Sequence, residues 1–198
     1  MELMRRKTGT VCMTLGTALI LAALSLFLWN RREDSRAGAT VEVVLPQVME
    51  QIEEDSAPSD PYSTEMSEAE VDGYEYIGYV SIPSLGLELP VMSDWSYPQL
   101  RIAPCRYYGS VGTEDLIIAA HNYSRHFGNI KNLLPGDDVY FTEMDGTVTA
   151  YEVAETDTLN PAAVEEMTDS GYALTLFTCT YGGQSRVTVR CSLAAVQT

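Results

Sequence analysis

The chain has 198 residues, and its 28 acidic against 12 basic side chains give a formal net charge of −16 at pH 7. This length allows one folded domain plus appendages. The acidity argues against nucleic-acid binding, because phosphate contacts require a basic stripe, and we interpret the acidic side chains as solvated surface and linker.

Residues 9–29 contain no charged side chain and are mostly apolar. At about 1.5 Å per residue this stretch crosses the roughly 30 Å hydrocarbon core of a bilayer. We predict a retained transmembrane anchor after a tail of residues 1–8. A cleaved signal peptide is the alternative, but the stretch exceeds the usual h-region and Trp29-Asn30-Arg31-Arg32 is a poor cleavage context. Basic residues flank both ends, so charge alone does not decide the orientation.

Residues 30–72 are predicted to be an acidic linker. Between 37 and 72 there are ten acidic residues and no Lys or Arg. Such a segment buries too little apolar surface to fold alone, and its charges repel, so an extended tether is expected. Val41 to Ile52 could form a short amphipathic helix, which Pro46 would interrupt.

From residue 73 to residue 198 the pattern is mostly β, with Gly, Pro or Asp between the apolar runs. A short helix is predicted over Asn160 to Met167, with Asn as cap and Pro in the first turn, and another helical turn near Phe127 to Leu133. Many short strands with little helix favour a barrel over an α/β sheet. The predicted strands are Tyr74 to Ile82, Leu87 to Met92, Leu116 to Ala120, Asp138 to Glu143, Thr147 to Thr156, Ala173 to Cys179 and Arg186 to Ala195.

The last two strands place a cysteine opposite an arginine. If residues 180–185 connect them, Cys179 lies across from Arg186 and Thr175 across from Arg190, and opposed side chains share one face. Leu174, Leu176, Thr178, Val187, Val189, Cys191 and Leu193 then form the apolar core face. The other face carries Thr175, Phe177, Cys179, Arg186, Thr188 and Arg190, so Cys179 and Arg186 are predicted to point away from the core.

A thiol beside a guanidinium suggests nucleophilic catalysis, because an adjacent cation stabilises the reactive thiolate. The alternative is that Cys179 is a small buried hydrophobe. Arg190 is a second candidate cation, but it lies four residues along the strand, roughly 13 Å from the level of Cys179 at about 3.3 Å per residue. Arg186 is therefore the preferred partner.

A cysteine–histidine mechanism must use one of the chain's two histidines. His121 ends the apolar run Leu116 to Ala120, where a chain leaving a sheet can present a side chain to a cleft. His126 follows five residues later in a polar segment. Either histidine could be purely structural; we predict His121 as the base and keep His126 as the alternative.

Three segments resemble the sortase family, the cysteine transpeptidases of Gram-positive cell surfaces. They are Ile117 to Asn122, the Thr-Leu-x-Thr-Cys signature over Thr175 to Cys179, and Arg186 at the start of the last strand. Weaker likeness covers Tyr76 to Pro83, Leu89 to Val91 and Leu134 to Asp137. The resemblance implies a closed β-barrel of about eight strands with one or two short helices over residues 73–198, and an active site on one face.

The resemblance also implies an activity and a location. Cys179 would attack a sorting signal of the Leu-Pro-x-Thr-Gly kind, His121 would transfer protons, and Arg186 would stabilise the oxyanion. Phe177, Thr178 and Asn122 would contact the peptide. An amine from a cell-wall precursor or a pilin lysine would resolve the acyl-enzyme. The N-terminus would lie in the cytoplasm and the catalytic domain outside the cell.

Asp60-Pro61-Tyr62 looks like the lid of pilin-assembling sortases, although those relatives usually carry a second membrane span after the barrel. Plain linker is the alternative interpretation.

The other cysteines are predicted to be inert: Cys12 lies in the apolar stretch and Cys191 on the core face. Pairing of Cys105 with Cys191 is conceivable outside the cell. No cofactor is expected. The two histidines and the cysteine spacing do not favour zinc, and Asp137, Asp138 and Glu143 are too generic to predict the calcium site of some relatives.

Two other functional classes are open at this point. One is a different extracellular cysteine enzyme, such as an L,D-transpeptidase or a papain-like peptidase, but the residues around Cys179 match neither pattern. The other is a membrane-tethered binding module, which predicts a thiol of ordinary reactivity.

Overall fold

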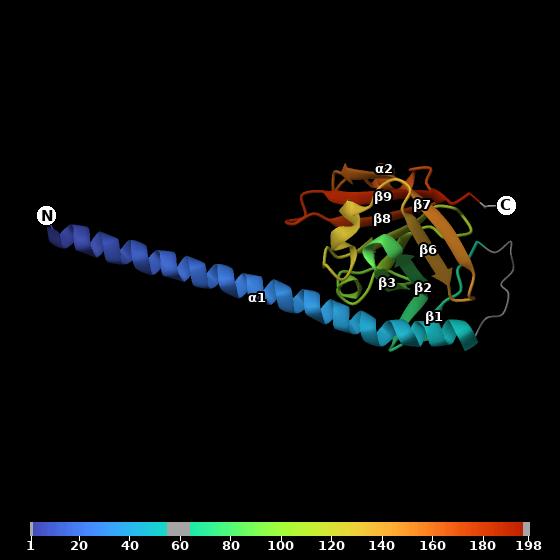
Figure 1. Ribbon diagram of the computed structural model, residues 1–198, viewed down its shortest axis with the longest axis horizontal. Helices are drawn as coiled ribbons and strands as arrows, with labels where there is room; N and C mark the ends of the chain where they lie inside the picture. Colours follow the sequence, from blue (N-terminus) through green and yellow to red (C-terminus); the bar gives the residue numbers. More distant parts are fainter. Residues whose placement is uncertain (1, 55–63, 196–198) are drawn as a thin grey trace. The chain divides into compact units, whose positions relative to one another are not determined.

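The computed structural model describes residues 2–54 and 64–195 (Figure 1). The chain divides into two compact units, with the boundary between residues 36 and 37. The first unit consists of the N-terminal part of helix α1, Glu2–Glu54. This helix is long and apolar enough to cross a membrane, and its large apolar side chains from Val11 to Trp29 are exposed. It is therefore a candidate membrane anchor.

Residues 37–54 belong to the second unit and are helical, whereas an extended tether was predicted, with a short helix over Val41 to Ile52 interrupted by Pro46 as a further possibility. They continue α1 as helix straight through Pro46. Val41, Val44, Val48 and Ile52 recur at helical spacing and are buried against the barrel. Burying each of them is worth about 1.5 to 3 kcal/mol, which together exceeds the roughly 3 kcal/mol cost of an internal proline. Contact with the barrel surface makes this helix stable, and that surface cannot be seen in the local sequence of residues 37–54.

The barrel is one sheet closed into a ring. Nine strands follow the order β1-β2-β3-β4-β5-β8-β9-β7-β6, and β2 also pairs with β6. Since β1 pairs only with β2 among the described strands, eight strands form the closed ring, as predicted. The strands are β1 Ala69–Val71, β2 Tyr74–Ile82, β3 Leu87–Met92, β4 Cys105–Tyr108, β5 Leu116–Ala120, β6 Asp138–Glu143, β7 Val148–Leu159, β8 Leu174–Cys179 and β9 Arg186–Leu193.

Helices are short within the barrel domain. They are η1 Pro83–Leu85, η2 Gln99–Arg101, η3 Phe127–Asn132 and α2 Val164–Thr168. The predicted turn near Phe127 is confirmed as η3. Helix α2 begins later than the predicted Asn160, because the Asn160 side chain accepts the N–H of Ala162 and forms a turn before the helix. Strands β1 and β4 were not predicted, and β7 extends three residues beyond the predicted Thr156.

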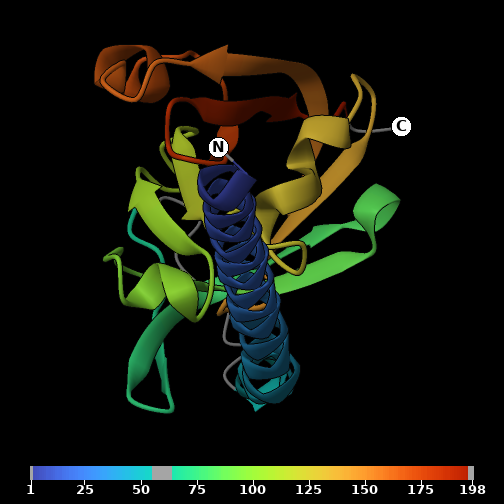
Figure 2. The ribbon, with the colours of Figure 1, turned by 90° about the vertical axis from the view of Figure 1, so that its left-hand side faces the viewer.

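The two faces of the β8–β9 pair are both largely covered. Leu174, Leu176, Val189 and Cys191 point into the main core, as predicted. On the outer face, Phe177 packs in a second cluster with Ile117, Ala119, Leu159 and Met167, the last of these in α2. Helix α2 is the orange helix beyond the end of β7 in Figure 2, and Figure 1 shows it beside β9. The outer face is therefore covered over most of its length, and only its end at Cys179 and Arg186 remains half-buried.

Barrel closure depends on a glycine. Gly78 of β2 pairs with Glu143 of β6, where the two ends of the sheet meet. It has φ +138, and a Cβ at this position would lie 1.9 Å from the carbonyl oxygen of Thr142. A side chain is thus excluded both by the backbone conformation and by the close approach of the partner strand.

We predict that Gly78→Ala lowers the free energy of unfolding by about 3 kcal/mol or more, because backbone strain and overpacking coincide. Gly86→Ala is the matched control, since Gly86 also has positive φ but an added Cβ would meet no atom within 4 Å; it should cost about 1 kcal/mol. Urea unfolding of the full chain in detergent measures both. Equal costs would contradict this explanation of closure.

Candidate active site

The β8–β9 hairpin has the predicted register. Cys179 pairs with Arg186, and Thr175 pairs with Arg190. The connection over residues 180–185 is held by the Thr180 N–H, which donates to the Ser185 carbonyl at 2.9 Å, and by the Gly183 N–H, which donates to the Thr180 carbonyl at 2.8 Å. Opposed positions in an antiparallel pair have Cβ atoms about 5 Å apart. The side chains of Cys179 and Arg186 therefore extend from adjacent positions on one face of the sheet.

His121 reaches the same level from the adjacent strand. Strands β5 and β8 are parallel, with Ala120 beside Thr178, and His121 and Cys179 are the next residues on each chain. Neighbouring strands lie about 4.8 Å apart. The Thr178 hydroxyl donates to the Ala120 carbonyl at 2.8 Å and ties the two strand ends together. The three predicted catalytic residues thus lie on the consecutive strands β5, β8 and β9 or at their ends, with Cys179 in the middle.

His126 and Arg190, the alternatives to His121 and Arg186, occupy different environments from the preferred residues. His126 is fully buried, whereas His121, Cys179 and Arg186 are half-buried. The Arg190 guanidinium donates to the Thr175 hydroxyl at 3.0 Å and to the carbonyls of Met167 and Glu166 at 3.2 and 2.6 Å. Arg190 therefore fastens α2 to the sheet, and Arg186 is the cation at the level of Cys179.

The charge at the site is incompletely matched. Nη1 of Arg186 is buried and has no hydrogen-bond partner among the described residues, so this cation is available to an anion. Burial lowers the pKa of His121, and the positive charge of Arg101 lowers it further. Arg101, in η2, is an electrostatic neighbour that sequence reasoning missed, because nothing local connects it with His121.

A small cavity of about 90 Å³ opens beside the thiol. Asn122 and Thr178, two of the three residues predicted to contact substrate, line it. Phe177 does not; it packs edge-on against Tyr107, with ring centroids 5.2 Å apart. Sequence reasoning missed Lys131 and Tyr181, which also line the cavity. Tyr181 is 84% exposed, and an aromatic residue two positions after Cys179 was the available signal in the sequence.

The remaining cysteines are free. Cys105 and Cys191 are buried in different apolar clusters and do not form the conceivable disulfide. Burial raises the pKa of each thiol to about 12, which disfavours the reactive thiolate. Cys12 lies exposed on α1. Within residues 2–54 and 64–195, no group of three His, Cys, Asp or Glu side chains is placed to hold a metal. Asp60-Pro61-Tyr62 falls outside the described residues.

Known proteins resemble both the sequence and the fold. The sortase A of Bacillus anthracis is 30% identical over 125 residues, covering 60% of this chain and 59% of that protein. The crystal structure of a sortase C1 from Streptococcus suis is 28% identical with a TM-score of 0.54, covering 61% of this chain and 73% of that one. The sortase C1 of Streptococcus agalactiae is 25% identical with a TM-score of 0.55, covering 64% and 71%.

The chain thus spans about three fifths of the length of the curated relative it matches. A family model described as the sortase domain matches residues 80–194, which include β5, β8 and β9 together with Cys179, His121 and Arg186. The match covers more than half of the chain and agrees with the closed eight-strand barrel. The chain belongs to the sortase family of cysteine transpeptidases.

Proposed function

We propose that this protein is a membrane-anchored sortase that cleaves a Leu-Pro-x-Thr-Gly-like sorting signal between Thr and Gly and transfers the acyl group to an amine. The observation that carries the proposal is the register of β5, β8 and β9, which brings Cys179 between His121 and Arg186. A cysteine, a histidine and an arginine at one half-buried edge can supply the nucleophile, the acid and base, and the oxyanion stabiliser of acyl transfer.

In the acylation step, the Cys179 thiolate attacks the carbonyl carbon of the Thr residue of the signal. Arg186 stabilises the oxyanion with a guanidinium nitrogen that has no hydrogen-bond partner among the described residues. The carbon–nitrogen bond then breaks, and the His121 imidazolium donates its proton to the leaving glycine amine. The products are a thioester on Cys179 and a neutral His121.

In the resolving step, an acceptor amine attacks the thioester carbonyl. His121 takes a proton from the amine, the Cys179 thiolate leaves, and a new amide bond forms. We propose that the acceptor is a cell-wall precursor or a pilin lysine; water in its place gives hydrolysis. The cycle returns Cys179 as thiolate and His121 as imidazolium, so no cofactor or metal is needed for its proton balance.

We propose that residues 9–29 anchor the protein with its N-terminus in the cytoplasm and the barrel outside the cell. The long apolar helix supports an anchor, and the family supports the orientation.

Mass spectrometry of the full chain incubated with a panel of sorting peptides tests the activity. We expect a thioester adduct on Cys179 and release of a peptide that begins with Gly. Cys179→Ala should abolish the adduct. His121→Ala should slow its formation about 10² to 10⁴-fold, the range for loss of a general acid. Cys12→Ala is the matched control and should leave the rate unchanged, because that thiol lies on α1. An adduct that survives Cys179→Ala would refute the assignment.

We also predict that Arg101→Gln raises the pKa of His121. Arg101 disfavours the imidazolium by charge repulsion, so its removal favours the protonated form. The limb of the kcat/KM profile that His121 sets should therefore move to higher pH. Arg36→Gln, on α1 outside the barrel unit, is the control and should leave both limbs in place. A shift to lower pH would show that Arg101 does not act through charge.

A further inference from the structure

The loop that carries His121 is compact. We call residues 121–128 the histidine loop. The Phe127 N–H donates to the carbonyl of His121 at 3.2 Å, and the Gly128 N–H donates to the carbonyl of Tyr123 at 2.9 Å. The ring centroids of His121 and Tyr123 are 4.9 Å apart, and those of Tyr123 and His126 are 5.6 Å apart. These contacts link His121 to the backbone and the aromatic rings of the rest of the histidine loop.

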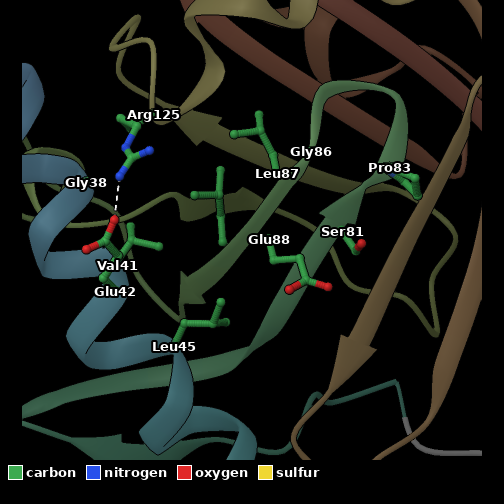
Figure 3. Close-up of a pocket in the computed structure, with 11 residues that line it drawn as sticks. Gly38, Val41, Glu42, Leu45, Ser81, Pro83, Gly86, Leu87, Glu88 and Arg125 are labelled. Atoms are coloured by element: carbon green, nitrogen blue, oxygen red, sulfur yellow. Dashed lines mark hydrogen bonds and ion pairs between the residues drawn. The ribbon is translucent and has the colours of Figure 1, made fainter.

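Arg125, on the outer side of the histidine loop, reaches across to helix α1. Its guanidinium forms an ion pair with Glu42 (Figure 3). Its aliphatic part lies on Gly38, since a Cβ at Gly38 would be 2.6 Å from Nε and 3.0 Å from Cγ of Arg125. The missing side chain at position 38 makes room for Arg125 against the helix.

Beside Gly38 and Val41, the helix and the barrel leave an open space between them. A cavity of about 560 Å³ lies between α1 and the β2–β3 turn, and Arg125 lies at its edge, as Figure 3 shows. Val41 and Leu45 line it from the helix, and Leu87 and Glu88 line it from the barrel. Arg125 therefore bridges the helix and the histidine loop across an open groove, while the helix itself is fixed further along by Val44, Val48 and Ile52.

We propose that Arg125 is a positioning residue: residues 37–54 of α1, through Gly38 and Glu42, hold the histidine loop and so set the place of the His121 imidazole relative to Cys179. The inference rests on the proposed function for its catalytic consequence. Its structural part, the dependence of His121 on the helix, does not.

Stability and catalysis should respond differently to loss of this contact. The side chains of Arg125 and Glu42 are 57% and 67% exposed, and exposed ion pairs contribute little to the free energy of folding. A displacement of about 1 Å in a catalytic group, by contrast, can cost about 100-fold in rate. The expected signature is a slower reaction in a protein of unchanged stability.

A charge-reversal series in the full chain, held in detergent, tests the proposal. Glu42→Arg and Arg125→Glu should each slow single-turnover acylation of Cys179 about 10-fold, and the double variant, which restores an opposite-charge pair, should recover most of the rate. Glu50→Arg, an exposed position on the same helix, is the matched control and should not change the rate. Thermal midpoints should stay equal throughout. Unchanged acylation in Glu42→Arg, or no recovery in the double variant, would overturn the proposal.

Imidazole NMR gives a readout that does not require activity. The chain has two histidines, so assignment needs one variant, His121→Gln. The His121 signal should move in Glu42→Arg, return in the double variant and stay in place in Glu50→Arg. If no peptide acylates the wild-type protein, the proposed function fails while this measurement still decides the inference. An unchanged His121 signal in Glu42→Arg would overturn the inference.

Gly38→Ala separates positioning from helix stability. Alanine favours the helix over glycine, so the thermal midpoint should stay level or rise, whereas the new methyl group displaces Arg125. Acylation should fall and the His121 signal should move. A rate and a signal that match the wild type would show that the contact at Gly38 has no influence on His121.

Discussion

The parallel pairing of β5 with β8 is the constraint on which the site depends. It joins segments 58 residues apart through the Thr178 hydroxyl and the Ala120 carbonyl, and it sets His121 and Cys179 at one level. Strand β9 completes the arrangement by presenting Arg186 opposite Cys179. Because each of β5, β8 and β9 has a neighbouring strand on both sides, slippage of any of the three would break hydrogen bonds on both of its sides.

The electrostatics of the site favour negative charge beside Arg186 and His121. Nη1 of Arg186 is buried with no hydrogen-bond partner among the described residues, and both burial and Arg101 oppose a charge on His121. Negative charge that develops between these groups would relieve both penalties. In the acyl transfer proposed above, such an arrangement would stabilise the oxyanion transition state more than the resting enzyme, which is the condition for catalysis. Arg190 differs because its guanidinium is already bound to α2 and Thr175.

Residues 37–54 show how tertiary contacts reverse a local prediction. Their acidic side chains and Pro46 favour an extended linker, yet Val44, Val48 and Ile52 find an apolar surface that includes Tyr76 and Met92 of the barrel. Once docked, this helix is in reach of the histidine loop through Arg125. A segment predicted to be a passive spacer thus contacts the part of the chain that carries the proposed acid and base.

The sequence by itself determined seven of the nine strands and the hairpin register that opposes Cys179 to Arg186, because side-chain alternation and turn residues act over a few positions. The family resemblance added the closed barrel. Tertiary structure alone decided which neighbours those residues meet. It placed Arg101 near His121, bound Arg190 to the carbonyls of α2, packed Phe177 in a cluster away from the cavity, and packed residues 37–54 on the barrel. These contacts join segments distant along the chain, and their energies depend on surfaces that exist only after the barrel has closed.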